Sequence, residues 1–284
     1  MTHAKKQTCL VLLISLFSVA AFAAPTRIVS MNLCADEMVL ALADREHIQS
    51  VSWFVANPDM SWSAEQAAGI PVNHGLAEEI IPLTPDLVVT GRFSNPATKD
   101  VLRRLGIPVF EISLATDLGS ISRQIRSVAQ VLQQEERGEG LVSAMQERFT
   151  QLGSGEPYAH LSAVVYEPNG YVAGVGSLAH EVIQVAGLRN LAVDLELVNY
   201  GQFPLELLIV NRPDVLIMNR LNDAAPSLAH AVLDHPALTK AFGAKEIVSI
   251  PSQAWACGSP KLLDAVAELR RAADLILASR TGLE

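Results

Sequence analysis

The stretch EEIIPLTPDLVV (residues 78–89) has a counterpart in the second half of the chain, PLELLIVNRPDVLI (residues 204–217). Each reads as a carboxylate, a short apolar helix, a Pro-Asp turn and a buried strand. One supersecondary unit used twice predicts two similar lobes, with Glu78 and Glu206 at equivalent places beside the short helices. Matching surface carboxylates on two lobes suit docking onto a two-fold symmetric partner, so the repeat favours transport over catalysis.

The N-terminus has the pattern of a cleaved secretory signal peptide at residues 1–23. Lys5 and Lys6 form its positive region, residues 10–22 its apolar region, and Ala21-Phe22-Ala23 a cleavage site of the small-x-small type. The apolar run is too short for a membrane span and no later segment has a long one, so we expect a soluble exported protein. In a Gram-negative cell its compartment is the periplasm.

The chain is acidic, with a formal net charge of −9 that becomes −11 when Lys5 and Lys6 leave with the signal peptide. Strong acidity argues against a nucleic-acid partner, which requires a basic face. Cys34 and Cys257 are the two cysteines that survive processing. An oxidising compartment permits a disulfide between them, but two free thiols are the open alternative because sequence gives no distance.

Alternating strands and helices predict an α/β fold built from parallel β-α units. The predicted strands are 27–30, 48–53, 87–90, 109–112, 163–166, 215–218 and 246–250. The longer predicted helices are 118–133, 135–152, 229–238 and 260–278, and a glycine-rich stretch at 170–176 predicts a tight turn. We therefore expect an N-terminal lobe at 24–134, a single connecting helix at 135–153 and a C-terminal lobe at 154–284.

Candidate ligand-binding residues follow the predicted strands, because ligands of open α/β sheets sit beyond the carboxyl ends of the strands. They are Asn32, Cys34, Trp53, Phe54, Trp62, Arg92, Phe93, Tyr166, Tyr171, Tyr200, Phe203, Arg220 and Trp255. So many aromatic rings in these loops predict a cleft for a large flat or apolar ligand. The alternative for any single ring is that it caps the core of its own lobe.

Enzyme signatures are poor, since no nucleophile elbow, zinc-protease motif or Walker loop is present. The histidines match no standard metal-ligand spacing. We therefore expect no catalytic residue, no metal site and no cofactor. The rival hypothesis is an exported enzyme with Cys34 as nucleophile, although no His stands in a recognisable pattern as its base.

Five motifs give the chain a close resemblance to a known family: RIVS at 27–30, LTPDLV at 83–88, LGIPV at 105–109, VAGLRN at 185–190 and RPDV at 212–215. It resembles the periplasmic binding proteins of metal-chelate ABC importers, which handle vitamin B12, ferric siderophores and haem. The resemblance implies two Rossmann-like lobes joined by a single long backbone helix, with the ligand cleft between them. It also implies that Glu78 and Glu206 of a monomer pair with arginines of an inner-membrane permease dimer, which works with ATPase subunits.

The motifs leave the ligand open. Trp255 before Gly258-Ser259-Pro260 resembles a loop of vitamin B12-binding proteins in which a tryptophan contacts the corrinoid, whereas Asn32-Leu33-Cys34 and Val72 depart from the family pattern. With Arg92 and Arg220 as the few cleft arginines, a near-neutral corrinoid or hydroxamate chelate fits better than an anionic catecholate. We therefore predict capture of a ferric siderophore or cobalamin for an ABC permease.

Haem is the alternative ligand within the same class of importer. Its iron requires an axial Tyr or His. Tyr166, Tyr171 and Tyr200 are the candidates.

Overall fold

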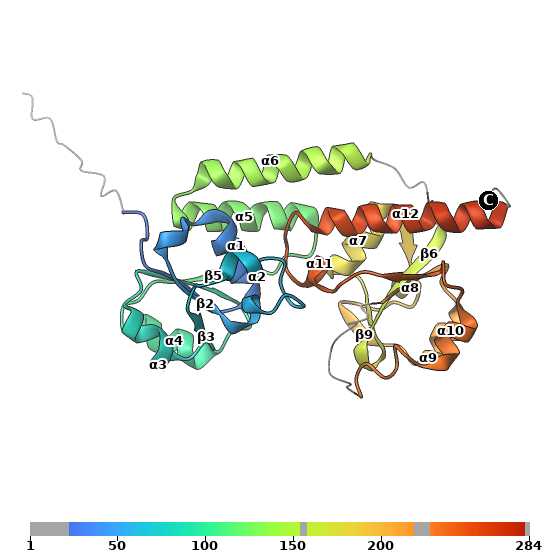
Figure 1. Cartoon of the computed structure of the whole chain (residues 1–284), viewed down its shortest axis with the longest axis horizontal. Coiled ribbons are helices and arrows are strands. Elements are labelled where there is room, and N and C mark those ends of the chain that lie inside the picture. Colours follow the sequence, from blue (N-terminus) through green and yellow to red (C-terminus); the bar gives the residue numbers. More distant parts are fainter. Residues whose placement is uncertain (1–22, 154–157, 219–227, 282–284) are drawn as a thin grey trace, which may run out of the picture.

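Each half of the chain folds around its own β-sheet, and the two resulting lobes lie side by side (Figure 1). The computed structural model describes residues 23–153, 158–218 and 228–281. The predicted α/β fold with two lobes is confirmed. Of the predicted signal peptide, only Ala23 falls within the described residues.

The sheet of the first lobe has five parallel strands in the order β3-β2-β1-β4-β5. They are β1 (Ile28–Ser30), β2 (Ile48–Ser52), β3 (Val72–Asn73), β4 (Leu87–Gly91) and β5 (Val109–Ile112). The connecting helices are α1 (Leu33–Leu42), α2 (Ala64–Ala67), α3 (Ala77–Ile80), α4 (Pro96–Arg104) and α5 (Leu118–Leu132). Because all five strands run the same way, the loops after them gather at one edge of the sheet.

The second sheet has the order β11-β10-β6-β7-β9, and β8 also pairs with β6. Its strands are β6 (Tyr158–Glu167), β7 (Tyr171–Ala173), β8 (Leu188–Asn190), β9 (Tyr200–Gln202), β10 (Val215–Met218) and β11 (Ile247–Ser249). Its helices are α7 (Leu178–Ala186), α8 (Leu191–Asp194), α9 (Leu205–Asn211), α10 (Pro236–Ala241), α11 (Gln253–Ala256) and α12 (Leu262–Thr281).

One strand of this sheet, β7, corrects the expectation of parallel pairing throughout. β7 runs antiparallel to both β6 and β9. Only residues 168–170 separate β6 from β7, and so short a connection allows a hairpin but no crossover. Asn169 and Gly170 both have positive φ there, so a tight turn lies at the very start of the glycine-rich stretch 170–176. The rest of that prediction is wrong for residues 171–173, which form β7.

The helix predicted at 229–238 is wrong. Residues 228–234 form turns, and α10 begins only at Pro236, with the His235 ring accepting a hydrogen bond from the Ala237 amide. Proline fits the first turn of a helix but not its interior, which explains why the helix starts at this residue.

Helix α6 (Glu135–Leu152) carries the chain from the first lobe to the second, and α5 and α12 lie beneath it (Figure 1). The largest hydrophobic cluster joins the lobes: it contains Val39 and Ile121 of the first and Ile183 and Leu262 of the second. Within the described ranges, no helix has both the length and the apolar character needed to cross a bilayer.

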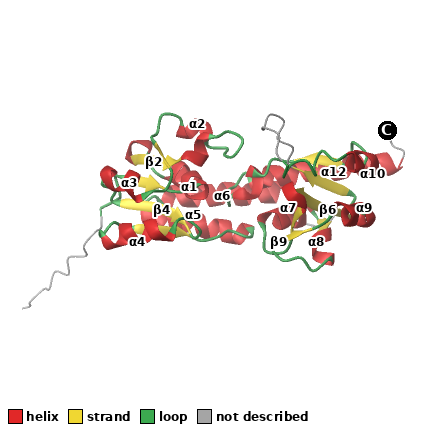
Figure 2. Cartoon of the chain, turned by 90° about the horizontal axis from the view of Figure 1, so that it is seen from below, coloured by secondary structure: helices red, strands yellow, loops and turns green. Residues whose placement is uncertain are grey.

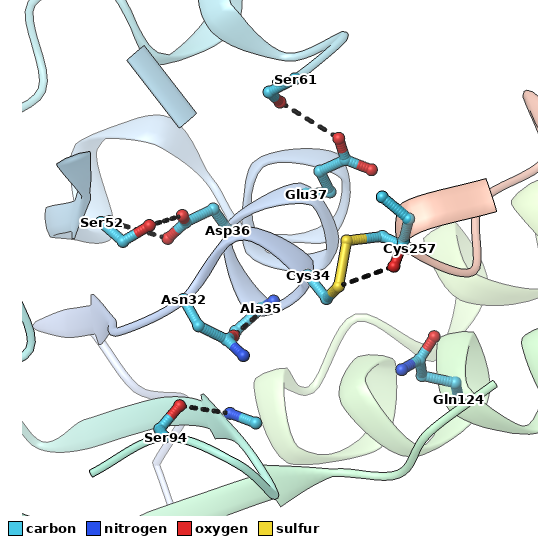
Figure 3. The surroundings of a disulfide bond; sticks show 12 residues. Asn32, Cys34, Ala35, Asp36, Glu37, Ser52, Ser61, Ser94, Gln124 and Cys257 are labelled. Atoms are coloured by element: carbon cyan, nitrogen blue, oxygen red, sulfur yellow. Dashed lines mark hydrogen bonds between the residues drawn. A yellow bond between two sulfur atoms is a disulfide. The ribbon is translucent and has the colours of Figure 1, made fainter. Parts of the chain in front are cut away.

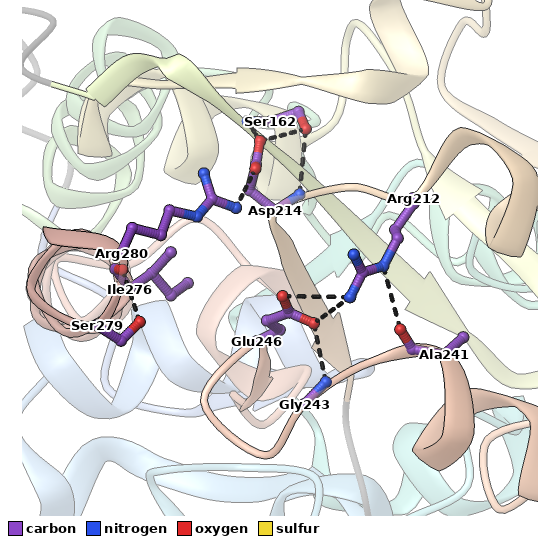
Figure 4. A network of polar contacts seen from close by, with 9 residues as sticks. All are labelled: Ser162, Arg212, Asp214, Ala241, Gly243, Glu246, Ile276, Ser279 and Arg280. Atoms are coloured by element: carbon purple, nitrogen blue, oxygen red, sulfur yellow. Dashed lines mark hydrogen bonds and ion pairs between the residues drawn. The ribbon is translucent and has the colours of Figure 1, made fainter. Parts of the chain in front are cut away.

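The repeated Pro-Asp unit has the same structure in both lobes. Asp86 accepts hydrogen bonds from the backbone amides of Thr26 and Arg27, which lead into β1. Asp214 accepts them from the amide and hydroxyl of Ser162 in β6, and Arg280 donates to its other oxygen (Figure 4). Each aspartate therefore ties the start of its own strand to the neighbouring strand in the sheet.

Asp36 lies fully buried in the first turn of α1. The backbone amide of Ser52 donates to its Oδ1 at 2.9 Å, and the Ser52 hydroxyl donates to Oδ2. Burial raises the pKa of Asp36 from 3.8 to about 7. The folded protein therefore holds the Asp36 proton to a higher pH than the unfolded chain does.

We expect Asp36→Asn to remove a pH dependence of stability. Because the folded pKa is raised, the contribution of Asp36 is complete below pH 4 and is lost as the pH rises to 7. This loss amounts to about 4 kcal/mol at 1.36 kcal/mol per pKa unit. Urea unfolding of wild type and variant between pH 4 and 8 measures the difference. Asp59→Asn, at an exposed site, is the control, and parallel curves for Asp36→Asn and wild type would contradict the expectation.

Candidate ligand-binding site

A cavity of about 420 Å³ lies between the lobes, at the edges where the strands of both sheets end. Its volume is typical of small-molecule sites. The first lobe contributes Asn32, Cys34, Gly91, Arg92, Phe93, Ile112, Ser113, Leu114, Ala115 and Gln124. The second contributes Gly176, Ser177, Leu178, Asn199, Tyr200, Trp255, Ala256, Cys257 and Gly258.

Six of the predicted ligand-binding residues line this cavity: Asn32, Cys34, Arg92, Phe93, Tyr200 and Trp255. Asn32 is the N-cap of α1, and its side chain is held in place because Oδ1 accepts a hydrogen bond from the Ala35 amide. The loop that carries Arg92 is held by Lys99, whose Nζ donates to the Arg92 carbonyl oxygen at 3.0 Å. Hydrogen bonds between side chains and the backbone therefore fix the parts of the cavity wall at Asn32 and at Arg92.

Four other predicted residues do not line the cavity. The rings of Trp53 and Phe54 pack together, with centroids 4.3 Å apart, and Trp62 lies under Lys261 Nζ at 5.1 Å. Tyr171 is exposed on β7. Arg220, another predicted ligand-binding residue, lies outside the described residues.

Tyr166 and Phe203 were expected at the cleft, but the structure places both rings in the core. They are 0% and 4% exposed and belong to the hydrophobic cluster that also contains Val164 and Leu216. Successive residues of a strand point to opposite faces, so Tyr166 shares the face of Val164. The next residue in β6, Glu167, points the other way.

Glu167 is a residue of the site that sequence reasoning missed. Its Oε1 accepts a hydrogen bond from Trp255 Nε1 at 3.3 Å, so its carboxylate lies directly behind a ring that lines the cavity. Burial raises the pKa of Glu167. Burial, and to a smaller extent the charge of Glu167, raise the pKa of Tyr200 to about 12.

Gln124 on α5 was also missed. Its Nε2 donates to the carbonyl oxygen of Ser113 at 2.7 Å, which holds the cavity loop 113–115. Its Oε1 is buried and accepts no hydrogen bond from the described part of the chain. An uncharged glutamine nearly two turns into a predicted helix gave no signal that could have been recognised in the sequence.

Cys34 and Cys257 form a disulfide at the cavity, between the start of α1 and the segment that follows α11 (Figure 3). Their Cα atoms are 5.1 Å apart. The structure therefore contains the disulfide rather than two free thiols. The hypothesis of a Cys34 nucleophile is wrong, because a bonded sulfur has no thiolate to attack with.

The disulfide is part of a wider contact between the segment 253–261 and the first lobe. A Cβ atom on Gly258 would lie 2.6 Å from Ala115 Cβ, so only glycine allows this approach. On the same side Gln253 donates to the Pro58 carbonyl oxygen, and Lys261 lies over Trp62. A segment of the second half of the chain thus completes the cavity against the first lobe.

The predicted docking residues Glu78 and Glu206 are both exposed, in the first turns of α3 and α9. These helices lie in different lobes, on the side of the molecule away from α6 (Figure 1), and Figure 2 shows this side from below. The equivalence expected from the repeat therefore extends to the short helices. Docking itself stays a prediction.

Comparison with known proteins identifies relatives along most of the chain. The family profile described as "Periplasmic binding protein" matches residues 28–254. A cobalamin-binding protein of Halobacterium salinarum is 23% identical over 262 residues, covering 87% of this chain and 69% of that protein. A vitamin B12-binding protein of Pectobacterium carotovorum is 26% identical over 223 residues, covering 75% and 78%.

A similar solved structure is the periplasmic haem-binding protein RhuT from Roseiflexus sp. RS-1 in its apo form. It superposes with a TM-score of 0.71 at 23% identity, covering 88% of this chain and 98% of that chain. At this identity the likeness supports the fold.

We expect loss of the disulfide to destabilise the folded protein. Changing Cys34→Ser and Cys257→Ser together should lower the free energy of unfolding by about 2–5 kcal/mol, because the bond closes a very long loop in the unfolded chain. Urea unfolding with and without a reductant measures the effect. The wild type should become less stable in reductant and the double variant should not respond, whereas a wild type insensitive to reductant would contradict the expectation.

Proposed function

Because the chain belongs to the periplasmic binding protein family, we propose that it captures a large metal chelate between its lobes and delivers it to an ABC permease. A cobalamin-type corrinoid is the chelate that the cavity suits best. The observation that carries this choice is a cavity wall of exposed apolar rings with a single cationic side chain, Arg92, among the described residues. The predicted signal peptide supports a periplasmic location.

The apolar part of the wall suits a broad flat ligand. Phe93 is 81% exposed, Leu114 63% and Tyr200 47%, although all three border the cavity. Burial of such apolar side chains by a ligand is favourable by about 25 cal/mol for every Å² removed from water. A corrin ring, held at its edge by a few polar contacts, would use such a surface.

The charge of the site argues in the same direction. Arg92 has no ion-pair partner within the part of the chain that the structure describes, so it is available for one anionic group. A corrinoid with one phosphate diester requires no more than this, whereas a catecholate chelate carries several negative charges. The names of the relatives from Halobacterium and Pectobacterium agree with a corrinoid.

Haem is the second candidate, because Tyr200 lines the cavity and a tyrosine is one of the axial ligands that ferric haem accepts. The solved structure of the Roseiflexus protein is that of a haem-binding protein. Against haem stands the raised pKa of Tyr200, about 12, because an iron-bound tyrosine is a phenolate. A ferric hydroxamate is the third chelate to include in a binding experiment.

We expect purified mature protein to bind cyanocobalamin more tightly than haemin or ferric hydroxamates. Phe93→Ala should weaken that binding about tenfold, since an aromatic contact is worth about 1–1.5 kcal/mol. Isothermal titration calorimetry with each chelate measures both. Leu275→Ala, which removes an exposed apolar side chain from α12 outside the cavity, is the control and should keep the wild-type affinity. Absence of binding by all three chelates would overturn the proposed function.

Delivery to the permease should depend on Glu78 and Glu206. Changing both to Ala should leave ligand affinity intact and reduce import at least severalfold, because exposed carboxylates on α3 and α9 provide the charge that a basic permease surface would bind. Uptake of labelled ligand by cells lacking the native binding protein measures import. The control variant Glu65→Ala with Glu147→Ala removes the same charge from exposed sites elsewhere. Equal import by the docking and control variants would contradict the docking role.

A further inference from the structure

The wall of the cavity in the second lobe has a carboxylate behind it. Glu167 ends β6, and Trp255 Nε1 donates to its Oε1 at 3.3 Å. Its charge also acts on Tyr200, and both Trp255 and Tyr200 line the cavity. The carboxylate therefore belongs to the electrostatic environment of any ligand held against these two rings.

The described residues give this carboxylate few polar partners. Among them, no Lys or Arg forms an ion pair with Glu167, and its side-chain hydrogen bond comes from the neutral indole of Trp255. A carboxylate accepts up to about four hydrogen bonds, and the described residues supply only part of this number. In a half-buried position its field reaches further than it would in water, because the surrounding dielectric constant is lower.

The opposite wall carries the other sign of charge. Arg92 follows β4 in the first lobe and lines the cavity. The two walls therefore differ in charge. The guanidinium of Arg92 in the first lobe attracts an anion, and the carboxylate of Glu167 in the second lobe repels one. A ligand with a single anionic group fits one orientation, but a ligand with carboxylates along its edge meets repulsion at the second lobe.

We propose that Glu167 is a specificity-determining residue, which excludes macrocycles with a carboxylate edge and admits macrocycles with a carboxamide edge. The inference rests on the proposed function and deepens it. Corrinoids carry neutral carboxamides, whose N–H groups are hydrogen-bond donors, whereas haem carries two propionates, which accept only. The Glu167 carboxylate, hydrogen-bonded to a ring of the cavity wall, repels a ligand carboxylate held against that wall and has no hydrogen bond to donate to it.

The test compares haemin with haemin dimethyl ester, two ligands that differ only in their carboxylates. In the wild type we expect the ester to bind about tenfold more tightly than haemin, a difference of about 1.4 kcal/mol. In Glu167→Gln this ratio should fall below about threefold, because the amide keeps the shape and an acceptor for Trp255 but removes the charge. Absorbance titration in the Soret band measures both dissociation constants, and the melting temperature of each variant reports folding.

Two further variants sharpen the result. Glu167→Asp keeps the charge and should keep most of the wild-type ratio. Glu147→Gln removes the same charge from an exposed site on α6 and should leave the ratio unchanged. A ratio in Glu167→Gln equal to that of the wild type overturns the inference.

Cyanocobalamin separates this outcome from failure of the proposed function. If the wild type binds cyanocobalamin but the ratio of the two haemin dissociation constants is the same in wild type and Glu167→Gln, the proposed function stands and selection by the charge of Glu167 is wrong. A wild type that binds neither cyanocobalamin nor either form of haem overturns both.

Discussion

The return of the segment 253–261 to the first lobe is the constraint on which the cavity depends. The disulfide between Cys34 and Cys257 holds it covalently, and the missing side chain of Gly258 lets the backbone approach Ala115. The same segment places Trp255 in the cavity wall. Without this contact α6, the hydrophobic cluster and the hydrogen bond from the Leu118 amide to Glu181 would still join the lobes, but the segment that carries Trp255 would lose its covalent bond to the first lobe.

The repeated unit made much of the fold predictable from sequence. Pro85 and Pro213 end the short helices, and the aspartates that follow, Asp86 and Asp214, hold the adjacent strands by their backbone amides. These are local signals with a physical mechanism, so they identified β4 and β10 correctly. The hairpin of β6 and β7 was not predictable in the same way, because a short turn shows that two strands are adjacent only once both strands are known.

The site was predictable as a region but not residue by residue. The loops after the strands were the right place to search, because parallel strands present their carboxyl ends together. The direction of each side chain was decided by strand alternation and by tertiary packing. Tyr166 therefore entered the core while Glu167, its neighbour, faced Trp255. Trp62 does not line the cavity, and its ring lies 5.1 Å from the Nζ of Lys261, a residue distant in sequence.

The same contacts bear on how a ligand would leave. A cavity wall that is bonded to the opposite lobe excludes a wide opening of the lobes around α6, because the disulfide lies beside the ligand rather than at the far end of the joint. The exposed carboxylates Glu78 and Glu206 lie on short helices in different lobes, away from the helical layer. Force applied at these helices would act on both lobes from one side, so small displacements of the loops around Phe93 and Tyr200 would be enough to uncover the ligand. With the wall bonded in this way, we infer that a ligand held in the cavity would be exchanged by local rearrangement at its mouth rather than by a hinge.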